Sequence, residues 1–212
     1  MKAVVCTKYG PPEVLQIQEV EKPIPKDNEV LVKIYATTVS AADYRVRGFN
    51  FPASIRLPVR LLVGFKRPRK SVLGMELSGK IESIGKNVSS FKKGDQVFAA
   101  SLQTFGAYAE YICLSEDGPI ALKPTNITYE EAAAIPIGAR TAYHHLKTIA
   151  NVQPEQKVLI YGASGSVGTY AVQLAKYFGA EVTAVCSTAN IEMVKALGAD
   201  NVIDYTRPNY TE

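Results

Sequence analysis

Hydrophobic positions in the last part of the chain switch repeatedly between the spacing of strands and that of helices. Short apolar runs of strand length alternate with segments that carry apolar residues at helical spacing and end at glycine. The predicted strands are 157–161, 181–186 and 201–205, and the predicted helices are 169–178 and the segment from Ile191 to Leu197. This βαβαβ order predicts the first half of a doubly wound parallel sheet.

The first 124 residues carry a different pattern, in which proline and glycine separate short strands. The predicted strands are 3–6, 14–17, 29–34, 79–85, 94–98 and 106–112. Many short strands broken by turns predict a compact, barrel-like β domain. Residues 50–72 interrupt this pattern, because cations are scattered there among apolar residues without any acid.

The connection between the two parts begins with a helix-start signal. Thr128 and Glu131 form a capping box, in which the threonine hydroxyl and the carboxylate can each accept from a free N–H. Pro136 interrupts this helix, and a second helix follows. We therefore predict a β domain over residues 1–124 and an α/β domain over residues 125–212.

The composition is that of an ordinary globular protein. Of the 212 residues, 47% are hydrophobic and 21% are charged, and no apolar stretch is long enough to span a bilayer. The first predicted strand begins almost at the first residue, so we expect no targeting peptide and a cytoplasmic location. Three widely spaced cysteines predict free thiols rather than disulfides or a cysteine-rich zinc lobe. The net charge of +4 suits an anionic cofactor and does not require a nucleic acid.

The basic residues within 50–72 allow three interpretations. The segment can be a lid that draws anionic ligands to an active site, a surface that touches anionic lipid, or a solvated surface excursion, which we favour. Nucleic-acid binding is disfavoured, because only Phe51 and Phe65 could stack on bases there.

A glycine-rich turn joins the first strand of the α/β part to its first helix and matches the dinucleotide fingerprint, with alanine at the first glycine. Gly165 would let a pyrophosphate approach the backbone, and Gly168 would let the helix pack closely on the strand. The free N–H groups and the positive dipole end of the helix would then bind the anion. The predicted cofactor-binding residues of this turn are Gly162, Ala163, Ser164, Gly165, Ser166, Val167 and Gly168.

The end of the next strand bears on the choice between NAD and NADP. An NAD site usually carries an acid there, which would repel the 2′-phosphate of NADP. Residues 186–190 contain no acid, and Ser187, Thr188 and Asn190 can donate hydrogen bonds to phosphate oxygens. We therefore favour NADPH over NADH, although none of these three residues is cationic.

A set of short motifs extends over the whole chain. These motifs are Lys8–Gly10, Val39–Tyr44, Gly74–Gly79, Gly94–Val97, Ala132–Pro136, Thr141–Tyr143 and Gly162–Gly168. Together they resemble the medium-chain dehydrogenase/reductase superfamily and, within it, the zinc-independent quinone oxidoreductases, including reductases similar to the reticulon-4-interacting protein. The resemblance implies a GroES-like barrel domain that carries the catalytic residues, followed by a Rossmann domain.

The resemblance also bears on zinc. Zinc-dependent members would carry cysteine at the position of Ser40, histidine at Met75 and a further ligand near Ile137. A catalytic zinc needs about three protein ligands, and serine, methionine and isoleucine do not supply them. We therefore expect no metal site.

Hydride transfer from NADPH to a small quinone or an α,β-unsaturated carbonyl is the reaction that the resemblance implies. By matching motifs, the residues that line the nicotinamide and acceptor pocket would be Ser40, Asp43, Tyr44 and Thr141. Tyr44 would donate to the acceptor oxygen, with Arg47 as a weaker candidate. Structural roles are the alternative, since Asp43 can cap or orient the loop of Ser40 and Tyr44 can be a packing residue.

The resemblance also implies contacts to the 2′-phosphate. Ser187 and Thr188 would make them together with Tyr205, the tyrosine that ends the third strand of the α/β part. Asn190 stands where some members of the family carry a lysine.

Only the first half of a doubly wound domain is present in the sequence. We expect the chain to be a fragment that binds the adenosine half of the cofactor weakly and turns over poorly, with its first parallel strand left as an apolar edge. The alternative is a non-catalytic NADPH-binding structural or interaction protein. The acceptor and the oligomeric state are left open, a homodimer of the full-length protein being one alternative.

Overall fold

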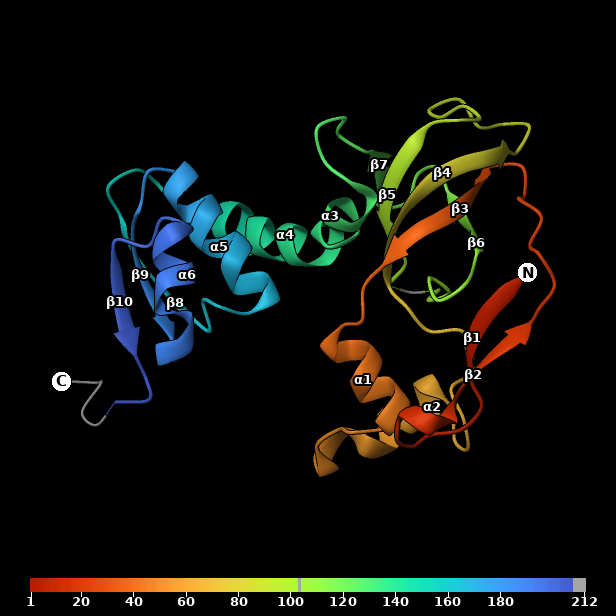
Figure 1. The fold of residues 1–212 in the computed structure, drawn as a ribbon, viewed down its shortest axis with the longest axis horizontal. Helices are drawn as coiled ribbons and strands as arrows, with labels where there is room; N and C mark the ends of the chain where they lie inside the picture. The colour runs from red at the N-terminus through yellow and green to blue at the C-terminus, as the bar shows by residue number, and fades with distance from the viewer. Residues whose placement is uncertain (103, 208–212) are drawn as a thin grey trace. The chain divides into compact units, whose positions relative to one another are not determined.

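The computed structural model describes residues 1–102 and 104–207. By its packing the chain divides into a first unit, Met1–Pro136, and a second unit that begins at Ile137. The first unit extends past residue 124 because α3 (Tyr129–Ala133) packs on its strands. The sequence-based boundary at residue 124 stays a prediction. Figure 1 shows the elements of both units.

Antiparallel strands build the first unit. They are β1 (Lys2–Cys6), β2 (Leu15–Glu19), β3 (Glu29–Thr37), β4 (Glu76–Ile84), β5 (Gln96–Ala100), β6 (Tyr111–Ser115) and β7 (Ile120–Leu122). β1 pairs with β2, and the others form a second sheet in the order β6-β3-β4-β5-β7. The expected β-rich domain is confirmed. The expected barrel is corrected, because within the described residues the strands form two sheets and do not close.

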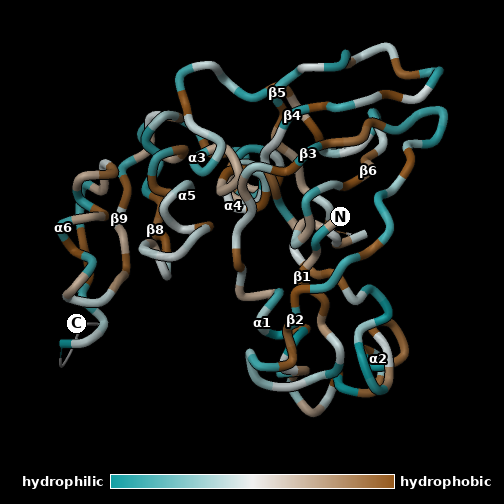
Figure 2. The backbone as a smooth tube through the Cα atoms, turned by 45° about the vertical axis from the view of Figure 1, so that its right-hand side comes forward, coloured by the Kyte–Doolittle hydropathy of each residue, from teal (hydrophilic) through white to brown (hydrophobic). Residues whose placement is uncertain are grey.

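Apolar side chains of the central strands form the core of the larger sheet. Val30 and Val32 of β3 lie on the same face as each other and are fully buried, as is Leu77 of β4. Figure 2 shows the hydrophobic positions along the strands of both units. The strand predicted over 106–112 is wrong in its first half, since β6 begins only at Tyr111.

The helical segments that precede β4 in the first unit are the main difference from the sequence prediction. They are η1 (Pro12–Val14), α1 (Ala41–Gly48), η2 (Ala53–Ile55) and α2 (Arg56–Val63). α1 was missed because it buries only Asp43 and Val46, so its sequence lacks an apolar stripe. α2 was missed because it buries no residue at all.

The connection and the second unit follow the predicted order. The elements are α4 (Ile135–Tyr143), η3 (His144–Ile149), β8 (Lys157–Tyr161), α5 (Ser166–Tyr177), β9 (Glu181–Cys186), η4 (Thr188–Asn190), α6 (Ile191–Ala196) and β10 (Asn201–Asp204). The capping box is confirmed, because the N–H of Glu131 donates to Oγ1 of Thr128 at 3.2 Å and the N–H of Thr128 donates to Oε2 of Glu131 at 2.8 Å. None of the helices in the described part of the chain is long and apolar enough to cross a membrane.

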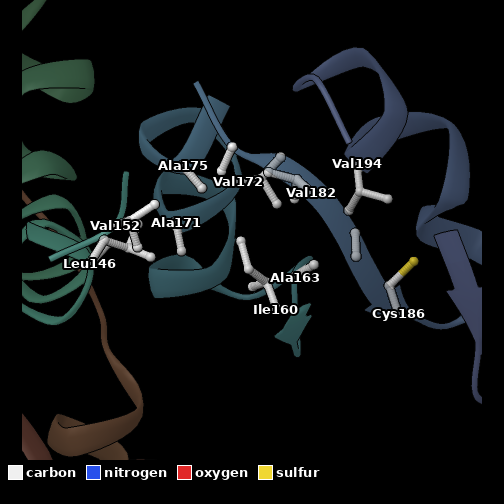
Figure 3. Packing of buried hydrophobic residues seen from close by; sticks show 13 residues of the cluster. Leu146, Val152, Ile160, Ala163, Ala171, Val172, Ala175, Val182, Cys186 and Val194 are labelled. Carbon is white, nitrogen blue, oxygen red and sulfur yellow. The ribbon is translucent and has the colours of Figure 1, made fainter. Parts of the chain in front are cut away.

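The three parallel strands of the second unit lie in the order β10-β9-β8 among the described residues. Both crossovers run in the same direction across the sheet, so right-handed connections place α5 and α6 on one face. Small side chains let these helices pack closely. Figure 3 shows Val172 of α5 close to Val182 of β9, and Ala171 of α5 close to Leu146 and Val152. The predicted βαβαβ unit is confirmed.

One edge of this sheet is exposed. In the described residues β8 pairs only with β9. Leu159 and Tyr161 on β8 are 61% and 72% exposed, whereas Ile160 between them is buried. The expectation that the first parallel strand forms an apolar edge is therefore confirmed.

Candidate cofactor and active site

The glycine-rich turn after β8 is fixed to the end of β9. The N–H groups of Gly162 and Ala163 donate to the carbonyl oxygen of Val185 at 3.1 and 3.0 Å. Gly162 has a φ of 75°, a left-handed conformation that costs other residues about 1–2 kcal/mol. The N–H of Gly165 donates to the carbonyl oxygen of Gly162 at 3.0 Å and closes the turn.

Gly168 sets how closely α5 lies on this turn. A Cβ atom at Gly168 would lie 2.2 Å from the carbonyl oxygen of Gly162 and 2.7 Å from Cα of Ala163. Both neighbours are backbone atoms that cannot move aside independently. The predicted role of Gly168 in close packing between helix and strand is confirmed.

The beginning of α5 presents N–H groups to solvent. Gly165 is the N-cap residue and makes no side-chain capping bond. Ser166, Val167 and Gly168 are the first helical positions, where N–H groups have no acceptor one turn earlier in the helix. Gly165, Ser166 and Val167 are exposed. Free N–H donors and a positive dipole end fit a phosphate group.

The residues after β9 bond to one another and to the end of β10. Nδ2 of Asn190 donates to Oγ of Ser187 at 3.0 Å, which leaves the hydroxyl hydrogen of Ser187 free. Oγ1 of Thr188 donates to Oδ2 of Asp204 at 2.6 Å. The hydrogen of Thr188 is therefore used within the protein. Tyr205 follows directly after β10 and is 44% exposed.

Asp204 is a residue of this region that sequence reasoning missed. The parallel register pairs Asp204 with Cys186, so a buried acid lies beside the end of β9 even though residues 186–190 contain none. Asp204 also accepts from Oγ1 of Thr206 at 2.6 Å, and Nε of Arg207 lies 3.3 Å from its Oδ2. The sequence signal that could have identified Asp204 is an acidic residue at the end of the strand that pairs with β9.

Protonation of Asp204 should destabilise the second unit. Hydrogen bonds from Thr188 first, and then from Thr206, lower the pKa of Asp204 from 3.8 to about 2. A carboxyl whose folded pKa is depressed stabilises the fold above its unfolded pKa and loses this contribution as pH falls toward the folded pKa. Stability of the second unit should therefore fall between pH 3.8 and about 2. In Asp204→Asn this part of the pH dependence should disappear, as measured by urea unfolding at each pH.

A control variant separates Asp204 from other acids. Glu192 on α6 lies 3.5 Å from Lys195 in an exposed i,i+3 pair, so Glu192→Gln should leave the pH profile of unfolding unchanged. An Asp204→Asn profile that matches the wild type in this acidic range would contradict the prediction.

The predicted catalytic residues of the first unit lie at the beginning of α1. Ser40 is the N-cap, and Oδ2 of Asp43 accepts from its N–H at 3.0 Å and from its Oγ at 2.7 Å. Oδ1 of Asp43 accepts from the N–H of Gly74 at 3.0 Å. The carboxylate thus ties the loop of Ser40 to the turn before β4, which confirms the capping role considered for Asp43.

Replacing Asp43 should destabilise the first unit. Asp43→Ala removes the cap, worth about 1 kcal/mol, and leaves the buried N–H of Gly74 without an acceptor, at about 1–3 kcal/mol. We expect a loss of about 2–4 kcal/mol in the free energy of unfolding, measured by hydrogen exchange of β4 amides. Asp95→Ala is the control, because Asp95 accepts from the N–H of Lys92 in an exposed loop. Equal losses in both variants would contradict the prediction.

Tyr44 is the most accessible of these residues. Its side chain is 52% exposed, and the guanidinium carbon of Arg47 lies 5.6 Å from its ring centroid. Nε of Arg47 and the hydroxyl of Tyr108 are buried and have no hydrogen-bond partner among the described residues. Burial, and then the negative charge of Asp43, raise the pKa of Tyr108. Tyr108 is a neutral donor that sequence reasoning missed.

Thr141, the fourth predicted catalytic residue, belongs to the second unit. It lies half-buried on α4, and its carbonyl oxygen is 2.9 Å from Nδ1 of His145. The structure brings Ser40, Asp43 and Tyr44 together at one helix end. The catalytic role of each of the four residues stays a prediction.

Comparisons with known proteins agree with this geometry. Residues 26–124 match the family described as Alcohol dehydrogenase GroES-like domain, and residues 166–212 match the family described as Zinc-binding dehydrogenase. The chain is 37% identical over 215 residues to the quinone-oxidoreductase homolog, chloroplastic, of Spinacia oleracea, covering 98% of this chain and 62% of that protein. It is 38% identical over 214 residues to the human NAD(P)H oxidoreductase RTN4IP1, mitochondrial, covering 97% of this chain and 54% of that protein. The chain belongs to the medium-chain dehydrogenase/reductase superfamily.

A solved member of the superfamily extends this likeness to the fold. The structure of mycobacterial Rv1454c complexed with NADPH is 30% identical, with a TM-score of 0.80, over 99% of this chain and 60% of that one. The chain thus spans about half to three-fifths of the length of these superfamily relatives. A GroES-like domain followed by part of a Rossmann domain is confirmed as the fold class.

Two positions that would carry zinc ligands in zinc-dependent superfamily members lie in the first unit. Ser40 donates its hydroxyl to Asp43, and Met75 is buried with 6% exposure. Neither side chain offers the thiolate or imidazole that zinc prefers. Independence of zinc stays a prediction for this chain.

Proposed function

We propose that the chain is part of an NADPH-dependent, zinc-independent oxidoreductase whose acceptor is a quinone or an α,β-unsaturated carbonyl. The uncapped N-terminus of α5 behind an exposed glycine turn carries the proposal, since free N–H donors there fit a diphosphate. The names of the spinach and human relatives, a quinone-oxidoreductase homolog and an NAD(P)H oxidoreductase, support the reaction class. The NADPH complex of Rv1454c supports the cofactor.

The residues of this chain would have the following roles in binding the cofactor and the acceptor. The N–H groups at the beginning of α5 hold the diphosphate. The free hydroxyl of Ser187 and the second amide hydrogen of Asn190 donate to the 2′-phosphate, while Arg207 offsets the charge of Asp204. Bound NADPH would supply the hydride. Tyr44 donates a hydrogen bond to the acceptor oxygen, where negative charge develops.

Oxidation of NADPH by the full-length protein with phenanthrenequinone tests this function. Tyr44→Phe should lower kcat/KM about tenfold to a thousandfold, because it removes a donor that acts in the transition state. Tyr177→Phe, at an 83% exposed tyrosine of α5, is the matched control and should keep the rate. Binding of NADPH without oxidation would favour the non-catalytic alternative. Unchanged rates in Tyr44→Phe would remove Tyr44 from the site.

A further inference from the structure

α2 carries a row of large apolar side chains that face solvent. Leu57, Leu61 and Leu62 are 68%, 54% and 77% exposed, and Phe65 just after the helix is 55% exposed. Leucines that are more than half exposed and lie on one side of a helix are unusual, because each forgoes the free energy of burial. An exposed apolar helix face of this kind marks an interaction surface.

Cations surround this row, and acids are absent from it. No aspartate or glutamate occurs between Asp43 and Glu76. The cations of this stretch on and after the helix are Arg56, Arg60, Lys66, Arg67, Arg69 and Lys70. All of them except Arg60 are exposed. The surface therefore combines apolar and positively charged groups, and its partner must be both apolar and negatively charged.

A hollow beside α2 adds a place for an anionic group. It has a volume of about 550 Å³ and is lined by Arg56 and Arg60 together with apolar and aromatic residues. The guanidinium carbon of Arg60 lies 4.2 Å from the ring centroid of Phe49 and 5.3 Å from that of Tyr9. Nε of Arg56 donates to the carbonyl oxygen of Phe51 at 3.1 Å. These contacts hold two cations at the hollow without neutralising them.

The two arginines of α2 and the residues at its C-terminal end attach the helix to the first unit. The hydroxyl of Tyr9 donates to the carbonyl oxygen of Gly64 at 2.8 Å. The N–H of Arg69 donates to the carbonyl oxygen of Val63 at 2.7 Å. Val63 is the helix residue that packs against a buried cluster. The leucine row therefore points away from the core, and Figure 2 shows hydrophobic and hydrophilic positions following one another closely along α2.

We propose that α2 and the basic segment after it dock on the surface of an anionic lipid membrane. The leucines and Phe65 enter the boundary between headgroups and acyl chains, and the cations reach headgroup phosphates from beside them. One phosphate lies in the hollow at Arg56 and Arg60. A membrane fits better than an acidic peptide, because it offers an apolar layer directly beneath an anionic one over the whole length of the helix.

Sedimentation with vesicles tests the docking independently of any enzymatic activity. The chain is mixed with vesicles of phosphatidylcholine alone or of phosphatidylcholine with phosphatidylglycerol. We expect binding to the anionic vesicles only, and weaker binding as salt is added. Equal binding to both vesicles, or to neither, would overturn the proposal.

Two variants separate the apolar and charged contributions. Leu61→Gln with Leu62→Gln should lower binding at least about tenfold, since two apolar side chains that enter the membrane in the proposed complex are lost. Lys66→Gln with Lys70→Gln should lower it about fivefold per cation. The matched controls are Ile24→Gln, at an 84% exposed residue outside α2, and Lys92→Gln with Lys93→Gln in an exposed loop. All controls should bind as the wild type does.

Other occupants of the surface would give different results. If the leucine variant changes the sedimentation coefficient of the free chain from dimer to monomer and no vesicle binding is found, a second copy covers α2 and the proposal is wrong. If glycerol phosphate displaces the chain and the leucine variant still binds vesicles like the wild type, the site takes free anions and membrane docking is overturned.

Discussion

Gly168→Ala should destabilise the second unit by about 3 kcal/mol. At an ordinary helical position this substitution stabilises by up to about 1 kcal/mol, because alanine is the better helix former. Here the added Cβ would lie 2.2 Å from the carbonyl oxygen of Gly162 and within 2.8 Å of two backbone atoms of Ala163. α5 would have to move away from the turn, and the packing of Val172 against β9 would loosen. Gly168→Ala should therefore destabilise the second unit, although the same substitution elsewhere in a helix stabilises.

Hydrogen exchange gives the free energy of opening for each unit separately. Amides of β9 should lose protection in Gly168→Ala, while amides of β4 in the first unit serve as an internal control. Gly162→Ala is the matched variant, because a Cβ there meets nothing within 4 Å and only the φ of 75° is unfavourable. Gly162→Ala should destabilise the second unit by about 1–2 kcal/mol. A Gly168→Ala chain as stable as the wild type would contradict the packing described here.

Gly165→Asp should remove cofactor binding without destabilising the fold. Gly165 has φ −80° and ψ 170°, an extended conformation that any residue adopts. Aspartate is a favourable N-cap, worth about 0.5–1 kcal/mol, which offsets the 3.3 Å approach of the added Cβ to the carbonyl oxygen of Gly162. Its carboxylate would lie among the N–H groups that we assign to the diphosphate. Affinity for NADPH should fall at least about a hundredfold.

Gly165→Asn isolates the effect of charge, since it has nearly the same size and also caps the helix. It should weaken NADPH binding less than Gly165→Asp does. Calorimetric titration measures the affinity of each variant, and circular dichroism during heating measures its stability. If Gly165→Asp bound NADPH as well as the wild type while remaining folded, the diphosphate would not lie at this turn.

Local patterns explain which parts of the fold the sequence predicts. Each strand and helix of the βαβαβ unit has its own apolar period and ends at a glycine, such as Gly179 or Gly198, so no distant contact is needed to recognise it. α1 lacks an apolar stripe, and α2 has leucines at helical spacing but buries none of them. α1 is fixed by hydrogen bonds that Asp43 accepts from Ser40 and from Gly74. Gly74 lies 31 residues further along the chain, so this contact cannot be recognised from a local pattern.

Some residues of the candidate site can likewise be recognised from local sequence, and others cannot. Gly165 and Gly168 are recognisable because their spacing reflects one turn and one helix. Asp204 and Arg207 could not be assigned from the chain order, because their place beside Thr188 depends on the register between β9 and β10. Residues 186–190 therefore contain no acid, whereas the fold places Asp204 beside them. Tyr108 was missed for the same reason, since its ring meets Gly74 only in the folded unit.

The most direct test of the account is nuclear magnetic resonance of the ¹⁵N-labelled chain during titration with NADPH. The backbone amides of Ser166, Val167 and Gly168 should show the largest shifts and should saturate together, because their N–H groups bind the diphosphate. Amides of β4 should not move with them. Saturable shifts that leave these three amides unchanged, or no shifts at any NADPH concentration, would contradict the proposed site.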